Sequence, residues 1–79
     1  MRLDKFLKVS RLIKRRTIAK EACEGGKVML NNRIAKPGAE VNIGDILEIA
    51  YGDRRLSVEI VNIDGKANKD EAREMYKVL

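Results

Sequence analysis

Residues 2–20 read RLDKFLKVSRLIKRRTIAK, and this stretch decides both the fold and the charge distribution of the chain. Its apolar side chains at Leu3, Phe6 and Leu7 follow the i, i+3, i+4 spacing of one helix face. Basic side chains recur between them, so we expect these cations to gather on an adjoining, water-exposed face. The stretch therefore predicts a short amphipathic helix at the start of the chain.

A second helix is predicted to begin at Ile18, directly after the basic cluster Lys14–Arg16. Thr17 stands at the N-cap position, where its hydroxyl can accept a hydrogen bond from a free backbone N–H. The helix is expected to end at Gly25-Gly26. Its predicted buried side chains are Ile18, Ala19, Ala22 and Cys23. Exposed amides at the helix start, together with the three cations before it, favour binding of a phosphate there.

From Lys27 onward the pattern changes to a period of two, in which Val28 and Leu30 alternate with Lys27 and Met29; this is the period of a half-buried strand. Asn31-Asn32 and Lys36-Pro37-Gly38 are turn sequences. The predicted later elements are an extended piece from Val41, a strand Ile46–Tyr51, a hairpin connection Gly52–Arg55, a strand from Leu56 reaching Ile63 at most, and a helix Lys69–Leu79. Two helices followed by a small antiparallel sheet indicate the α+β class.

Length and composition narrow the protein classes that fit. A chain of 79 residues predicts one domain, 1–79. The single cysteine cannot form an internal disulfide, which favours a reducing compartment. Apolar runs are too short for a transmembrane helix, and residues 1–5 do not resemble a secretory signal. We therefore expect a soluble, cytoplasmic protein.

The positive charge is concentrated near the N-terminus. Residues 1–20 carry eight basic side chains against one acidic, a net charge of +7, whereas the whole chain carries +5. This asymmetry predicts a polyanionic partner, either nucleic acid or an anionic membrane; the alternative is a solvated helix face. Only 4% of residues are aromatic, so recognition through phosphates and shape, as in structured RNA, is favoured over base stacking. Arg11 and Arg16 are the strongest candidates because a guanidinium can bridge phosphate oxygens.

The sequence offers no catalytic constellation. It lacks histidine, which is the commonest general base and metal ligand at neutral pH. Without an activating histidine, Cys23 is interpreted as a buried small hydrophobe. Tyr51 is expected to pack at a strand end, and stacking on a base is the alternative role for it. The glycines are dispersed and form no nucleotide-binding motif. We therefore predict no enzymatic activity, no catalytic residue, no cofactor and no metal.

The same residues carry a family resemblance. The motifs are Arg2-Leu3-Asp4-Lys5-Phe6-Leu7, Arg11-Leu12, Arg16-Thr17-Ile18-Ala19, Gly26-Lys27-Val28, Asn31-Asn32, Lys36-Pro37, Val41 and Gly44-Asp45. In this order they resemble the S-four (S4) domain, also called the alpha-L motif, over about residues 2–49, which leaves a hairpin and helix in residues 50–79. Arg15 stands where relatives often have Ser, and Asn32 where Gly often completes the turn.

The resemblance implies two helices packed on a small sheet, with a basic face that docks on structured RNA. The RNA contacts that it implies are Arg2, Lys5, Arg11, Lys14, Arg15, Arg16, Thr17 and Lys20, with Lys36 as a weaker contact. Pseudouridine synthases and tyrosyl-tRNA synthetases carry the same domain next to a catalytic domain, which is not expected in this chain. The heat-shock ribosome-recycling relatives carry a long basic C-terminal extension, which is not expected here either.

The short stand-alone form is similar to the group of the bacterial RQC P-site tRNA stabilising factors. This implies a factor that binds large-subunit rRNA and stabilises peptidyl-tRNA in the P site of obstructed subunits, while a partner protein directs C-terminal tailing. A monomer is expected when the protein is free. The alternatives are a heat-shock-type recycling factor, a generic binder of structured RNA, a membrane-surface helix over residues 2–16, and a protein-interaction module using the more acidic C-terminal half.

Overall fold

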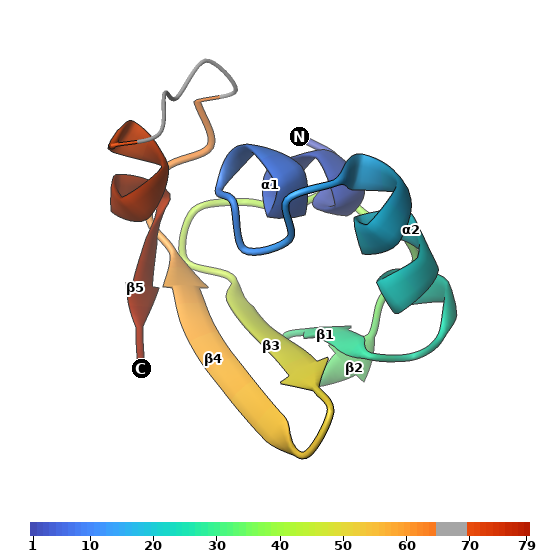
Figure 1. Ribbon diagram of the computed structural model, residues 1–79. Helices are drawn as coiled ribbons and strands as arrows, with labels where there is room; N and C mark the ends of the chain where they lie inside the picture. The colour runs from blue at the N-terminus through green and yellow to red at the C-terminus, as the bar shows by residue number, and fades with distance from the viewer. Residues whose placement is uncertain (65–69) are drawn as a thin grey trace.

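The protein is described from a computed structural model, which defines residues 1–64 and 70–79. Its helices are α1 (Leu3–Val9), α2 (Arg16–Glu24) and the short 3-10 helix η1 (Glu71–Met75). Its strands are β1 (Val28–Leu30), β2 (Arg33–Ile34), β3 (Ile46–Tyr51), β4 (Arg54–Ile60) and β5 (Tyr76–Val78). The two α-helices pack against each other and lie over one face of the sheet (Figure 1). This arrangement confirms the predicted α+β class.

All five strands form one antiparallel sheet in the order β2-β1-β3-β4-β5. The strand predicted over Ile46–Tyr51 is confirmed as β3. Tyr51 pairs with Arg54, so the hairpin turn itself is only Gly52-Asp53. Arg54 and Arg55 therefore belong to β4 rather than to the predicted connection, and β4 ends at Ile60, short of Ile63.

The core lies between α1 and the sheet. Leu3, Phe6 and Leu7 are fully buried, as the helical spacing predicts. The sheet contributes the inward-facing members of its alternating pattern, which are Val28, Leu47, Ile49, Val58 and Ile60. Because the same three residues of α1 belong to this small core, α1 is fixed relative to the sheet, and its lysines Lys5 and Lys8 face outward.

The second helix begins two residues earlier than predicted. Arg16 is its first residue and Arg15 occupies the N-cap position, so the prediction of Thr17 as the N-cap is wrong. Ala19 and Cys23 are buried as expected and Ala22 is half-buried, but Ile18 is 46% exposed. The reason is geometric: residues four apart lie on one helix face. A helix that turns Ala19 and Cys23 inward therefore places the neighbouring Ile18 at the edge of that face.

The predicted C-terminal helix Lys69–Leu79 is also wrong, although Lys69 itself lies outside the described residues. The segment forms one 3-10 turn, η1, followed by strand β5. Ala72 and Met75 are buried at a spacing of three residues, which one 3-10 turn accommodates. The chain then pairs with the free edge of β4, Tyr76 opposite Ile60 and Val78 opposite Val58, so sheet hydrogen bonds replace helical ones.

The segment between β2 and β3 holds the start of α1. The backbone N–H of Leu3 donates to the Ala39 carbonyl at 2.8 Å, and the N–H of Asp4 donates to the Pro37 carbonyl at 3.0 Å. The extended piece predicted from Val41 forms no strand; Glu40 makes an isolated bridge to Arg2 instead. The bonds from the N–H groups of Leu3 and Asp4 satisfy amide donors that the first turn of a helix leaves free.

Within the described ranges 1–64 and 70–79, none of the helices is long and apolar enough to cross a bilayer.

The turn between β1 and β2 uses Asn31 and Asn32, as predicted. Their φ angles are 52° and 67°, which place both residues in the left-handed region. The Asn31 side chain accepts a hydrogen bond from the Ile46 N–H at 2.9 Å and donates one to the Asp45 carboxylate at 3.1 Å. Asn31 thus joins the turn to the start of β3, whereas Asn32 contributes mainly its tolerance of the backbone conformation.

This difference predicts the effect of changing Asn32. The substitution Asn32→Ala should lower the free energy of unfolding by about 1 kcal/mol, because a β-carbon disfavours positive φ. The control variant Asn32→Gly should be at least as stable as the wild type, because glycine adopts this conformation readily. Urea denaturation of the three proteins measures the difference. Equal stability of the Ala and Gly variants would contradict the left-handed turn.

Candidate nucleic-acid interface

A buried carboxylate, Asp4, organises two of the predicted RNA-contact residues. Asp4 lies in the first turn of α1 and is only 3% exposed. One carboxylate oxygen accepts a hydrogen bond from Nη2 of Arg2 at 3.3 Å. The other oxygen accepts from Nη2 of Arg16 at 3.3 Å and from the backbone N–H of Lys5 at 2.8 Å. The starts of α1 and α2 are therefore joined through one acidic side chain.

The surroundings of Asp4 keep it ionised. Burial acts to raise the pKa of Asp4, but the hydrogen bonds from Arg16 and Lys5 and the charges of Arg16 and Arg2 outweigh it. The net result is a pKa below the ordinary value of 3.8. At neutral pH the carboxylate is therefore charged, and it attracts both guanidinium groups.

Both arginines also keep surface that faces water. The side chain of Arg2 is 54% exposed and that of Arg16 is 48% exposed. A guanidinium has five N–H donors, so one hydrogen bond to Asp4 leaves donors for an external anion. The ion pair thus restricts the orientation of the two groups without closing them to a ligand. This arrangement suits recognition of phosphates, which arginine can bind through two parallel hydrogen bonds.

The loop between α1 and α2 is held by specific bonds. Arg11 has a φ of 62°, an uncommon conformation for a residue other than glycine. The buried Ser10 hydroxyl donates to the Leu7 carbonyl at 3.3 Å, and the Tyr51 hydroxyl donates to the Leu12 carbonyl at 2.8 Å. The loop is therefore attached both to α1 and to the end of β3.

Tyr51 lies at the end of β3, where the sequence places it. Its side chain is 41% exposed, and its hydroxyl attaches the strand end to the α1–α2 loop through the bond to Leu12. Burial raises the pKa of Tyr51, with a smaller contribution from the charge of Tyr76. The phenol is therefore neutral at physiological pH and can serve as a hydrogen-bond donor to the loop.

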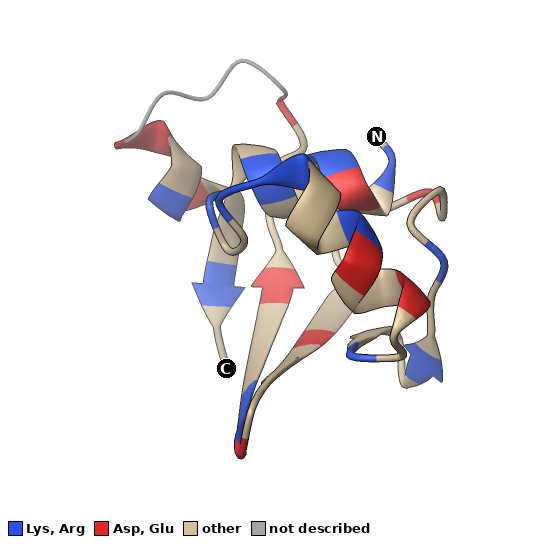
Figure 2. Cartoon of the chain, turned by 45° about the vertical axis from the view of Figure 1, so that its right-hand side comes forward, with Lys and Arg blue, Asp and Glu red and all other residues tan. Residues whose placement is uncertain are grey.

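The predicted contact residues lie on the helical side of the molecule. Figure 2 shows Lys and Arg over α1 and over the loop that follows it; α1 carries one acidic residue, Asp4, and α2 carries two. Asp4, Arg2 and Arg16 together form the Asp4 cluster. The predicted contact residues outside this cluster are all exposed: Lys5, Arg11, Lys14, Arg15, Thr17, Lys20 and Lys36. Within residues 1–64 and 70–79, none of the lysines and arginines in this set forms a salt bridge. Their positive charge is therefore available to a polyanion.

A groove of about 1050 Å³ brings three of these residues together. It runs between α2 and residues 33–39, and its cations are Arg2, Lys20 and Lys36, together with Arg33. The Arg2 guanidinium lies over Gly38, where an added β-carbon would be 3.6 Å from Nη2. The sequence reading did not select Arg33, because an isolated arginine beside a turn carries no charge-cluster signal. The other six predicted contact residues do not line the groove: Lys5, Arg11, Lys14, Arg15, Arg16 and Thr17.

The single cysteine is part of the packing. Cys23 is 2% exposed on the inner side of α2. Burial raises its pKa to about 11, with further contributions from the charges of Asp4 and Glu24. Its thiol is therefore protonated at neutral pH, which agrees with the interpretation of Cys23 as a small hydrophobe rather than a nucleophile.

Residues 1–47, which carry α1, α2 and the Asp4 cluster, match the family model described as the S4 domain. This chain belongs to the S4 domain family. The match ends within β3, so most of β3, β4, η1 and β5 lie outside it.

Individual relatives are similar to this S4 protein beyond residues 1–47 as well. The chain is 54% identical over 78 residues to the RQC P-site tRNA stabilizing factor of Halalkalibacterium halodurans, covering 99% of this chain and 89% of the relative. It is 36% identical to the heat shock protein 15 homolog of Haemophilus influenzae, covering 98% of this chain and 60% of that protein. The trimeric structure of Vibrio cholerae heat shock protein 15 has a TM-score of 0.92 at 34% identity, covering 100% of this chain and 81% of the other.

The Asp4 cluster yields a pH-dependent prediction. The variant Asp4→Asn keeps the shape of the side chain but removes its charge. It should lower the free energy of unfolding at pH 7 by about 1–2 kcal/mol. This loss is smaller than that expected for a fully buried ion pair, because both arginine side chains are about half exposed to water. The pKa of Asp4 in the folded protein lies below 3.8. The wild type should therefore be more stable than Asp4→Asn above pH 3.8, and this difference in the free energy of unfolding should disappear as the pH falls through the folded pKa. Denaturant titrations between pH 7 and acid measure this convergence.

A matched control is available on the sheet. Glu48 forms a salt bridge of 3.4 Å with Arg55, whose side chain is 72% exposed. The substitution Glu48→Gln should therefore change the free energy of unfolding by less than about 0.5 kcal/mol. If Asp4→Asn were as harmless as Glu48→Gln at pH 7, the organising role of Asp4 would be refuted.

Proposed function

We propose that this protein is a non-enzymatic RNA-binding factor of ribosome-associated quality control, which stabilises peptidyl-tRNA in the P site of obstructed large ribosomal subunits. The observation that carries the proposal is the pair Arg2 and Arg16, held by Asp4 within a wider exposed basic surface. Membership of the S4 family and the 54% identity to a protein named RQC P-site tRNA stabilizing factor support it.

The proposed contacts are with phosphates rather than with particular bases. Arg2 and Arg16 would bind backbone oxygens of rRNA or tRNA with the donors that Asp4 leaves free. The exposed cations of α1, the following loop and α2 would neutralise further phosphates. The proposed interface consists of Arg2, Lys5, Arg11, Lys14, Arg15, Arg16, Thr17, Lys20 and Lys36. Structured RNA suits such a surface because it is recognised largely through shape and phosphate positions.

Binding alone is sufficient for the proposed activity. A protein that contacts rRNA and tRNA together binds more tightly to the state in which both are correctly placed, and by linkage it stabilises that state. No bond needs to be made or broken by the factor itself. We further propose that a partner protein adds residues to the stalled peptide while this factor holds the tRNA, and that the factor is a cytoplasmic monomer when free.

Two alternatives are separated by specific observations. Similarity to heat shock protein 15 homologs favours a second candidate, a recycling factor for large subunits. The two roles differ in whether peptidyl-tRNA lies beside the protein on the ribosome. A membrane-surface helix is less well supported, because the apolar residues that it would insert into lipid, Leu3, Phe6 and Leu7, are fully buried in the core.

The test compares large subunits that carry peptidyl-tRNA with vacant large subunits. We expect tighter binding to the obstructed subunits, measured by co-sedimentation with labelled protein. If about four to six phosphates are neutralised, the logarithm of the affinity should fall with the logarithm of salt concentration at a slope of roughly −3 to −5. Equal binding to both kinds of subunit would reject the P-site role and leave recycling or general RNA binding.

Arg15→Ala provides a variant for the same assay. Arg15 is exposed and forms no salt bridge within the described part of the chain, so its removal should not disturb Asp4, whereas removal of Arg16 would. The salt slope should become less steep by about one unit. Lys77→Ala on β5 removes one positive charge elsewhere and serves as the control.

A further inference from the structure

A polar cavity lies where the α1–α2 loop meets the C-terminal segment. Its volume is about 430 Å³, which is within the size range of small-ligand sites. The loop contributes Ser10, Arg11 and Lys14 to its lining, and the C-terminal segment contributes Ala72, Arg73 and Tyr76. The cavity is therefore formed partly by the S4 match, residues 1–47, and partly by chain that lies outside it.

Three cations meet at this cavity without an acidic partner. Within the described residues, Arg11, Lys14 and Arg73 form no salt bridge, and no Asp or Glu lines the cavity. Like charges around a shared polar space repel one another, and a bound anion would offset that repulsion. Arg73 lies in an acidic segment that also carries Asp70, Glu71 and Glu74. The charge pattern of the sequence therefore does not indicate Arg73 as part of an anion-binding site.

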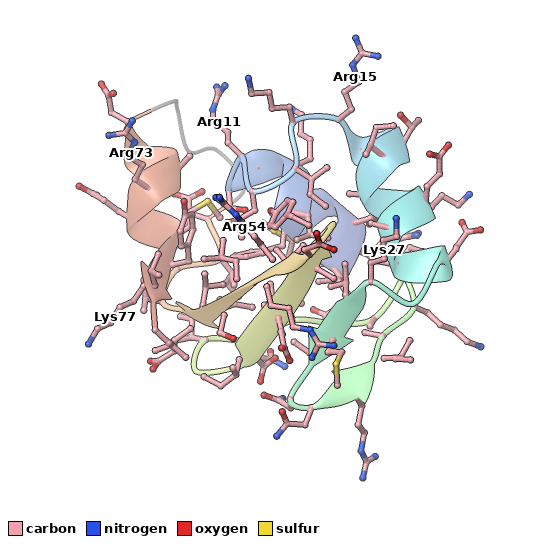
Figure 3. All side chains as sticks on the ribbon, turned by 60° about the horizontal axis from the view of Figure 1, so that its bottom comes forward. Arg11, Arg15, Lys27, Arg54, Arg73 and Lys77 are labelled. Atoms are coloured by element: carbon pink, nitrogen blue, oxygen red, sulfur yellow. The ribbon has the colours of Figure 1, made fainter. Side chains whose placement is uncertain are left out.

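The backbone on both sides of the cavity is firmly placed. Arg11 sits in the loop whose neighbours Ser10 and Leu12 are bonded to α1 and to Tyr51. On the other side, Ala72 is buried and Tyr76 pairs with Ile60 of β4, so both ends of η1 are anchored. Figure 3 shows Arg11 and Arg73 on the same side of the molecule, whereas Lys77 projects away from them.

We propose that this cavity binds one backbone phosphate of the RNA partner, with Arg73 completing a site that Arg11 and Lys14 begin. The ligand chemistry is a phosphodiester anion, and the guanidinium groups supply the paired donors that its free oxygens accept. This inference rests on the proposed function for the identity of the RNA. It adds the C-terminal segment to the binding surface, so the interface extends beyond the residues that match the S4 model.

The test uses two variants with the same change in charge. Arg73→Gln removes the proposed contact, whereas Lys77→Gln removes a cation from the adjoining strand, in register with Glu59. Arg73→Gln should weaken binding to obstructed large subunits about tenfold and make the salt slope less steep by about one unit. Lys77→Gln should bind like the wild type. Thermal unfolding of both variants should match the wild type, because both side chains are exposed.

A second measurement uses pyrophosphate as the probe, so that the cavity is tested without RNA. Titration followed by amide NMR should shift the signals of residues 10–14 and 72–76 in the wild type and in Lys77→Gln, but not in Arg73→Gln. Identical subunit binding by the two variants would overturn the inference and leave the proposed function standing. Failure of the wild type to bind subunits would overturn the proposed function, and the pyrophosphate shifts would then decide whether the cavity binds phosphate at all.

Discussion

The buried charge of Asp4 is the constraint on which the basic surface depends. A carboxylate removed from water is stable only when donors and opposite charges surround it. Here those groups come from the residue before α1, the first turn of α1 and the first residue of α2. The need to satisfy one acid therefore fixes the relative position of two helix starts and of two arginines that are separated by fourteen positions in the sequence. The two guanidinium groups that are proposed to bind RNA are therefore the same groups that hold the two helix starts together.

Local pattern was enough to predict much of this fold. Leu3, Phe6 and Leu7 repeat at helical spacing, and the apolar residues of β3 and β4 alternate, so each element could be placed from its own sequence. The turn at Asn31-Asn32 follows from the tolerance of asparagine for positive φ. The charge excess in residues 1–20 indicated the side of the molecule on which to search for a polyanion site.

The features that escaped prediction depend on contacts between distant segments. Ala72, Met75, Tyr76 and Leu79 have helical spacing, but the open edge of β4 recruits part of that segment as β5, and this edge is not visible in the local sequence. In the sequence, Asp4 is only the one acidic residue among many basic ones in residues 1–20. Its contact with Arg16 forms because the α1–α2 loop brings the start of α2 next to it, and a local pattern does not show that contact. Arg33 and Arg73 were missed because each is a solitary cation whose neighbours come from elsewhere in the chain.

The most direct measurement of the central claim is ¹⁵N relaxation of the arginine Nε–H groups in the free protein. If Asp4 holds Arg2 and Arg16, their guanidinium groups should have higher order parameters than that of Arg15, which forms no salt bridge among the described residues. In Asp4→Asn protein that difference should vanish. Guanidinium groups of Arg2 and Arg16 as mobile as that of Arg15 in the wild type would contradict the account.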